Sequence, residues 1–281
     1  MQSNFESHFQ KRRNRFYVFM KKIKEIVGIL VIVLITLCSC TTETIEQAPM
    51  LKRIVEVSVD GSSNTTNLNY NGNKIATIDK VDAFLEFYYT GDLITKIVEL
   101  TKSNSHKNTL DYFYSGGQLI KITSSDNYVV NYVHNADSSI SYEKLTKDAN
   151  NLEVKIHHGI LYFQNGNLSK DEKIFDNAGK GVLVKNTIEI AYDAKKNSLN
   201  SILGFNKLLD YSKVISANNA ITNIEISSVK NADDDQVTSS IKRYDSQYEY
   251  NSNGYPTEIV SEKIIFGGTD SKHVKSQLFY N

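Results

Sequence analysis

The sequence predicts an all-β domain, a long antiparallel meander of repeated hairpins that forms a curved sheet or a partly closed barrel. Composition is the first reason: the 281 residues include 17 Tyr and 12 Phe but no Trp and only two Pro. Aromatic and β-branched residues favour strands, whereas Asn, Ser and Gly favour turns. The second reason is a hairpin-like unit that recurs along the chain.

Each unit has an aromatic or β-branched pair at the end of one strand, then Gly or Asn in a turn, then an apolar residue, polar residues and an Ile. The clear copies are LNYNGNKIATI (68–78), EFYYTGDLITKI (86–97), DYFYSGGQLIKI (111–122) and YEYNSNGYPTEI (248–259), and looser copies cover 160–171, 190–202 and 212–224. The copy at 160–171 has Asp171 where Ile is expected, which predicts a shorter or shifted hairpin. Because the copies keep no fixed period, a twisted meander fits better than a solenoid.

One segment interrupts the hairpins. The stretch SLNSILGFNKLLDYSK (198–213) places apolar residues at roughly helical spacing: Ile202, Leu203, Phe205, Leu208 and Leu209. The spacing predicts a short helix or plug near residues 200–211, over an open end of the sheet. An irregular crossover loop fits the segment equally well.

The N-terminal segment is typical of an export signal. From Met20, three lysines precede a run from Ile26 to Leu37 that is apolar except for Gly28 and Thr36. This run is shorter than the roughly 20 residues that a membrane-spanning helix needs. Residues 1–39 are therefore expected to be an N-terminal extension and a signal peptide, with Met20 as a suitable start.

The end of the apolar run resembles the lipobox of bacterial lipoproteins, with Leu37, Cys38, Ser39 and Cys40 in its four positions. The resemblance implies that Cys40 receives a diacylglycerol group, that cleavage occurs before Cys40, and that palmitate-type acyl chains anchor the mature protein to a membrane. Several acyl chains give stable anchoring, whereas one does not. Residues 40–50 are then a lipidated tether, and residues 51–281 form a single all-β domain.

The tether also bears on location. In the lipoproteins that this segment resembles, an Asp after the lipidated cysteine causes retention in the inner membrane, and the residue here is Thr41. The resemblance therefore implies the outer membrane, on its periplasmic or its cell-surface side. Glu43 and Glu46 resemble a diluted surface-export tag, and a solvated linker explains them equally well.

The repeated units look like degenerate YD-type hairpins. The block YDAKKNSLNSILGFNKLL (192–209), followed by SANNAI (216–221), is similar to one in uncharacterised outer-membrane lipoproteins of the Bacteroidota. The resemblance covers most of residues 65–280. It implies an all-β envelope protein and identifies no catalytic residue.

Charge and histidine spacing exclude several classes of function. From Cys40 onward there are 25 Lys and Arg residues against 30 Asp and Glu residues, which argues against a nucleic-acid partner. His157 and His158 are adjacent, so they point to opposite faces of a strand and cannot share one metal. We expect no metal site and no cofactor, and surface positions for the five histidines of the domain, which are His106, His134, His157, His158 and His273.

The acidic run NADDDQVTS (231–239) is the best candidate for an ion site. Asn231, Asp233 and Asp235 fit positions 1, 3 and 5 of a calcium-binding loop. The sixth position is Gln236 instead of Gly and the twelfth is Lys242 instead of Glu, so an EF-hand loop does not fit. The run is expected to be a solvated hairpin tip.

Aromatic residues at equivalent hairpin positions are the candidate binding residues. Since adjacent strand residues face opposite ways, one set fills the core and the other can form an exposed ladder that stacks on sugar rings or on a partner protein. Cross-strand pairing that only stabilises the sheet is the alternative. The candidates are Tyr88, Tyr89, Tyr112, Tyr114, Tyr162, Tyr248 and Tyr250.

No nucleophile elbow, P-loop or dinucleotide-binding motif occurs in the sequence. The expected function is therefore a non-catalytic, lipid-anchored envelope module that binds a protein or glycan partner. A purely structural envelope lipoprotein is one alternative. The other is a glycan hydrolase with paired carboxylates, for which Glu86 and Glu99 are candidates.

Replacing Cys40 by Ala is expected to abolish lipidation, because only a thiolate is nucleophilic enough to accept the diacylglycerol group. The variant should lose palmitate labelling, change its apparent size on a gel and leave the lipoprotein membrane fraction. If it still fractionates with the membrane and shows no change in size, the lipoprotein interpretation is wrong.

Overall fold

The computed structural model describes residues 49–179, 181–231, 236–265 and 272–281. The chain divides into two units, Met1–Gln47 and Ala48–Asn281. The signal segment, the lipobox and Cys40 lie outside the described residues, as does the centre of the acidic run at 232–235. The second unit is the predicted all-β domain.

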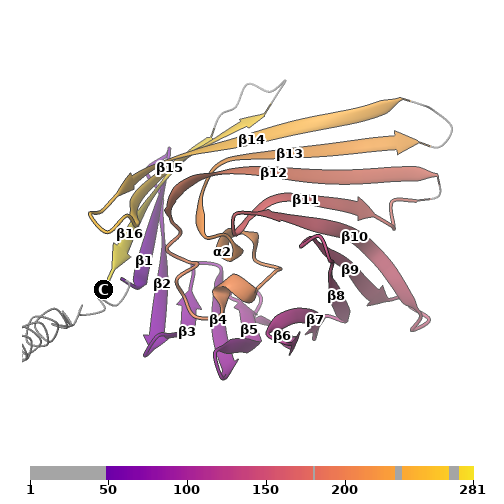
Figure 1. The fold of residues 1–281 in the computed structure, drawn as a ribbon, viewed down its shortest axis with the longest axis horizontal. Helices are drawn as coiled ribbons and strands as arrows, with labels where there is room; N and C mark the ends of the chain where they lie inside the picture. The colour runs from indigo at the N-terminus through magenta and orange to yellow at the C-terminus, as the bar shows by residue number, and fades with distance from the viewer. Residues whose placement is uncertain (1–48, 180, 232–235, 266–271) are drawn as a thin grey trace, which may run out of the picture. The chain divides into compact units, whose positions relative to one another are not determined.

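Sixteen strands in the described residues form one antiparallel barrel (Figure 1). The first eight are β1 (Leu51–Ser58), β2 (Ser63–Asn71), β3 (Lys74–Asp79), β4 (Ala83–Thr90), β5 (Leu93–Thr101), β6 (His106–Ser115), β7 (Gln118–Ser124) and β8 (Tyr128–His134). The others are β9 (Ile140–Lys147), β10 (Glu153–Gln164), β11 (Asn167–Phe175), β12 (Val182–Lys196), β13 (Asn218–Asn231), β14 (Val237–Tyr250), β15 (Pro256–Ile265) and β16 (Lys272–Tyr280).

The barrel is fully closed. Each strand pairs with its neighbours in sequence, and β1 pairs with β16 from Leu51 opposite Tyr280 to Ser58 opposite Val274. The predicted all-β meander and its barrel form are therefore confirmed, whereas the alternative of an open curved sheet is wrong and closure is complete instead of partial. Closure between the first and last strands pairs the backbone groups that an open edge would leave free.

A β-bulge explains the spacing of the repeated unit. In the returning strand β5, Ile94 and Ile97 are both fully buried although they are three residues apart, because the register shifts between them. One extra residue keeps both apolar side chains on the inner face, which strict alternation would not allow. Equivalent shifts occur in β3, β7, β11 and β15. Asp171 thus keeps the register position of the missing Ile, and the expected shift of that hairpin does not occur.

Tyrosine hydroxyls explain the recurrent aromatic residue. Near one end of the barrel the backbone ladders between successive hairpins stop, and a Tyr of the later strand donates a hydrogen bond to a carbonyl of the earlier one. The bonds run from Tyr70 to Leu51 (2.7 Å), Tyr114 to Ile94 (2.8 Å), Tyr192 to Leu168 (2.7 Å), Tyr248 to Ala220 (2.8 Å) and Tyr280 to Pro256 (2.6 Å). In β8, His134 Nε2 lies 2.9 Å from the carbonyl oxygen of Leu119 in the same way. The repeated tyrosine therefore satisfies carbonyls that the sheet leaves unpaired.

The segment between β12 and β13 fills this end of the barrel. It contains a 3-10 helix, η1 (Phe205–Lys207), and a short helix, α2 (Ser212–Ile215), both drawn within the ring of strands in Figure 1. Its buried side chains are Ile202, Phe205, Leu208, Val214 and Ile215, which belong to the same core as the inner residues of the strands. We call residues 197–217 the plug.

Two contacts fix the plug against β4 and β5. The ring of Phe205 lies 5.6 Å from that of Phe87, and Tyr89 donates a hydrogen bond to the carbonyl of Leu203 at 3.0 Å. Gly204 has φ +81°, and a Cβ there would lie 3.0 Å from the carbonyl oxygen of Asp92. Only glycine allows the plug to approach the β4–β5 turn this closely. Within the described part of the chain, no helix is long and apolar enough to cross a membrane.

Leu208→Ala should destabilise the protein by about 2–5 kcal/mol, because it leaves a cavity where the side chain is 1% exposed. Leu183→Ala, on an outer position that is 49% exposed, is the matched control and should change the free energy of unfolding by about 0.5 kcal/mol or less. Urea unfolding measures both. Equal effects of the two substitutions would show that the plug does not contribute to the core.

Candidate binding site on the inner wall of the barrel

Strand register identifies the residues of the inner wall, because directly paired residues share one face of a sheet. Leu161 is buried in the core and pairs with Asp171, which pairs with Ile188. Ile188 pairs with Glu225, and Glu225 pairs with Lys242. Charged side chains therefore lie on the inner wall, on the same face as the apolar core.

The inner wall differs between the two ends of the barrel. At the end that holds the plug, it consists of buried apolar residues such as Leu51, Ile94, Leu119 and Leu168. Towards the other end, which we call the open half, the inward positions are mostly polar and only partly buried. They include Glu99, Asn108, Ser124, Lys144, Thr146, His157, Lys173, Asn186, Ser227 and Lys242. The open half is thus a polar compartment above an apolar floor.

Two carboxyl groups that accept hydrogen bonds from tyrosine hydroxyls mark the boundary between these regions; Asp171 is partly buried, and Asp210 is accessible to solvent. Tyr112 donates a hydrogen bond to Asp210 of the plug at 2.8 Å, and Tyr142 donates one to Asp171 at 2.7 Å. Desolvation raises the pKa of Asp210 to about 6 and raises that of Asp171 above its usual range. The tyrosine hydroxyls favour the charged carboxylates and so oppose this effect.

A second cluster lies on β9, β10 and β11. Lys144 pairs with His157, which pairs with Phe175, while Lys173 occupies the next inward position of β11, opposite Gly159. The Lys144 ammonium group lies 3.6 Å from the centre of the Tyr128 ring. Burial, and then the charges of Lys173 and Lys144, lower the pKa of His157 to about 4, so its ring is neutral at pH 7.

Aromatic rings hold this cluster in place. The His157 ring makes edge contacts with Tyr142 at 6.0 Å and with Phe175 at 5.9 Å between centroids. Tyr142 lies against Gly159, where an added Cβ would be 2.6 Å from the ring. Glycine at this position therefore allows Tyr142 to lie flat on β10 and reach Asp171.

The tyrosines proposed from the sequence divide between the two walls. Tyr89, Tyr112, Tyr114, Tyr248 and Tyr250 face inward, and each donates its hydroxyl within the barrel. Tyr248 and Tyr250 stack at 5.9 Å, with Tyr250 bonded to Asp193. The other two lie on the outer wall, where Tyr88 is 48% exposed and Tyr162 lies beneath the Lys170 ammonium group.

The structure corrects two interpretations of single residues. Glu86 pairs with Val98, whereas Glu99 pairs with buried Leu85, so the two glutamates lie on opposite walls and form no catalytic pair. His157 and His158 face opposite ways as expected, but His157 lies half-buried on the inner wall and not on the surface. His134 likewise faces inward and is partly buried, so the expected surface position is wrong for it too. His158 lies outside, 2.8 Å from Asp176.

Sequence reasoning missed Lys144 and Lys173 because the segments that hold them lack the clear aromatic-turn signature. The available signal is alternation: Tyr142 and Lys144 share one face of β9, and Asp171 and Lys173 share one face of β11. No group of three or more metal-binding side chains occurs in the described residues.

The outer wall carries charged pairs around the barrel, near the middles of its strands. The pairs are Lys96 with Asp111 (3.7 Å), Lys155 with Glu143 (2.8 Å), Lys170 and Lys185 with Glu172 (3.1 and 3.3 Å), Arg243 with Asp245 (2.8 Å) and Lys275 with Glu258 (2.6 Å). Exposed pairs of this kind contribute little to stability. They place charge at mid-height of the described outer wall, which also carries exposed apolar side chains such as Phe113, Val133 and Phe279.

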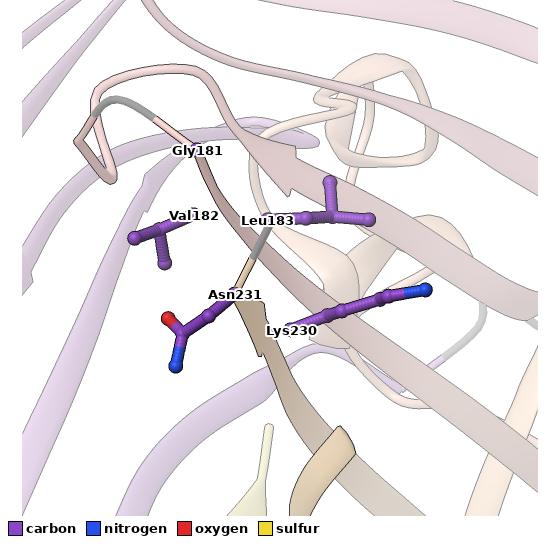
Figure 2. Close-up of a pocket in the computed structure, with 5 residues that line it drawn as sticks. All are labelled: Gly181, Val182, Leu183, Lys230 and Asn231. Atoms are coloured by element: carbon purple, nitrogen blue, oxygen red, sulfur yellow. The ribbon is translucent and has the colours of Figure 1, made fainter. Parts of the chain in front are cut away.

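Two pockets lie at the rim of the open half. One of about 290 Å³ is lined by Gly181, Val182, Leu183, Lys230 and Asn231, at the ends of β12 and β13. Figure 2 shows that Val182 and Asn231 point to one side of this strand pair, whereas Leu183 and Lys230 point to the other, so the side chains do not converge on one point. The other, of about 220 Å³, lies at the ends of β7 to β10 and is lined both by inner-wall residues, Ser124, Tyr128 and Thr146, and by outer-wall residues that include Lys147 and Glu153.

Comparison with known proteins identifies a similar fold. No family model matches the sequence, and no curated protein matches it. A porin-like protein from Bacteroides vulgatus ATCC 8482 is similar with a TM-score of 0.52 and 13% identity, over 83% of this chain and 99% of that chain. A porin-like protein from Bacteroides uniformis ATCC 8492 matches with a TM-score of 0.30 and 10% identity, over 82% and 98% of the two chains. The first likeness concerns the fold alone.

The raised pKa of Asp210 predicts a pH dependence of stability. The folded state keeps its proton up to about pH 6 and the unfolded state loses it near pH 3.8, so this group's contribution to stability decreases as pH rises between these values. The Asp210 side chain is accessible to solvent, and screening reduces the size of the effect. Asp210→Asn keeps an acceptor for Tyr112 and does not titrate. The free energy of unfolding of the variant minus that of the wild type should therefore increase from pH 4 to pH 7. A constant difference across this range would contradict a raised pKa of Asp210.

Proposed function

We propose that this chain is a lipid-anchored, non-catalytic binding protein of the bacterial outer envelope, with its barrel in water and its ligand site in the open half. The single observation that carries the proposal is the charged outer wall. The porin-like neighbour supports an envelope location, and the lipobox resemblance supports the anchor.

The outer wall argues against burial in lipid. Transmembrane barrels present an apolar band about 25 Å tall, and a Lys or Arg at the bilayer midplane costs about 2–4 kcal/mol. Here ion pairs occupy central outer positions on several sides of the barrel, among them Lys170, Glu172 and Arg243. The alternation of charged and apolar residues is that of a solvated sheet surface.

The plug argues against a channel. Phe205, Leu208 and Ile215 are nearly fully buried among inward strand residues, which fills one end with apolar side chains. A pore that conducts ions or polar solutes needs a polar path along its length. A barrel with a filled end and a polar open half suits binding better than passage.

The position of the tether fits this arrangement. β1 begins at Leu51, directly after the expected tether of residues 40–50, and Leu51 pairs with Tyr280 at the end that holds the plug. The anchored chain therefore enters the barrel at its filled end. A barrel held by this tether can turn its open half away from the membrane, towards a soluble ligand, a glycan or a protein partner.

A protease site inserted in the tether, between Cys40 and Met50, tests the proposal on the full chain. Cleavage of isolated membranes should release the folded barrel into solution without detergent, because the anchor is then its only attachment. The parent protein without the inserted site is the control and should stay in the pellet. A cleaved barrel that needs detergent for extraction would show that the strands themselves lie in the membrane.

A further inference from the structure

We infer that the inner wall of β9, β10 and β11 binds a small organic oxyanion, a carboxylate or phosphate group carried on a flat apolar body, between Lys144 and Lys173. This inference rests on the proposed function and specifies its ligand class. The first observation is that both lysines face the inside of the barrel on strands that flank β10. No carboxylate of the described residues lies within ion-pair distance of either lysine.

The nearby acids do not neutralise the two lysines. Asp171 lies on the same wall as Lys173, but its carboxyl group is largely buried and accepts the hydroxyl of Tyr142. Asp176 lies 2.8 Å from His158 on the outer wall, and Asp126 lies about 3 Å from the His106 ring. The wall between Tyr142 and Phe175 therefore holds two cations with one carboxylate below them.

The opposite side of the barrel differs. There Glu225 and Lys242 are directly paired on the inner wall, and Tyr244 lies 3.5 Å from the Glu225 carboxylate. Lys263 lies 5.7 Å from the centre of the Tyr244 ring. Both sides therefore hold two lysines and one carboxylate, but Glu225 directly faces Lys242, whereas neither Lys144 nor Lys173 faces an acid on the neighbouring strands.

Partial burial makes these lysines suited to an anion. Burial and then the charge of Lys173 lower the pKa of Lys144, and the charge of Asp126 only partly opposes them, so an anion between the two lysines would relieve unfavourable interactions that exist without it. A neutral His157 between the two strands offers one N–H donor and one acceptor nitrogen. Two ammonium groups and one imidazole N–H can donate hydrogen bonds, and carboxylate and phosphate oxygens accept such charge-assisted bonds well.

The surroundings indicate what the oxyanion is attached to. Tyr128 lies beneath the Lys144 ammonium group, and Phe175 lies on the other side of His157. Aromatic rings beside a cationic centre suit a flat apolar group with an anionic end.

Calorimetric titration of the lipidated protein in non-ionic detergent, at constant ionic strength, tests the inference with benzoate, phenyl phosphate, inorganic phosphate and neutral benzamide. Benzoate or phenyl phosphate should bind, inorganic phosphate should bind more weakly, and benzamide should not bind measurably. The better of benzoate and phenyl phosphate identifies the anionic group.

Lys144→Met and Lys173→Met should each weaken binding at least tenfold, because each removes one cation and keeps most of the apolar side chain. Lys121→Met, at an exposed position of the outer wall, is the matched control and should bind as the wild type does. Lys173→Arg should keep most of the affinity, and circular dichroism of each variant verifies that the barrel is folded.

Two results would overturn the inference. The first is unchanged affinity in both Met variants, and the second is binding of benzamide equal to that of benzoate. Either result would contradict the proposed anionic ligand class, but it would not contradict the proposal that the barrel is a binding protein. Retention of the cleaved barrel in the membrane pellet instead contradicts the proposed function itself.

Discussion

The hydrogen bonds from tyrosine hydroxyls to backbone carbonyls determine how this barrel is built. At the filled end the strands of successive hairpins separate, and the ladder between them ends before the strands do. Carbonyls of buried residues such as Leu51, Ile94 and Leu168 would then lack a donor, at a cost of about 1–3 kcal/mol each. A tyrosine supplies it at five of these positions in the described strands, and His134 occupies the equivalent place in β8. The ring fills the space between the strands, so the same residue satisfies the backbone and extends the core.

Separation of the strands at one end makes room for the plug, and the plug in turn divides the barrel into two environments. Phe205 and Leu208 complete an apolar floor that the strands alone do not provide. Above this floor the inward positions need not be apolar, because side chains there contact water instead of other side chains. The lysines, His157 and the polar residues of the open half are therefore tolerated by the fold because the plug has already completed the core.

The local features of the fold could be predicted from the sequence, but the global ones could not. The hairpins are encoded by local turn residues, and the plug near residues 200–211 is encoded by local apolar spacing. The structure contains the hairpins and the plug. Closure depends on the pairing of Leu51 with Tyr280, which are more than two hundred residues apart, and no local pattern encodes such a contact. The bulges also change which residues face inward, so alternation counted across a turn assigns positions such as Glu99 and His157 to the wrong wall. Lys144 and Lys173 were missed for another reason, since no aromatic-turn signature marks the segments that hold them, although simple alternation with Tyr142 and Asp171 places both on the inner wall.

Pairing of β1 with β16 also sets the order of events during folding. β1 is synthesised first and has no partner on one side until β16, the last strand, is available. During that interval both strands at the seam have free backbone groups that can pair with another chain. Non-local closure of this kind is slow, so the period of exposure is long. A chain that is truncated before β16 keeps the edge of β1 unpaired. Proteases and holdase chaperones, which act on such exposed edges, can therefore distinguish an incomplete chain from a closed barrel.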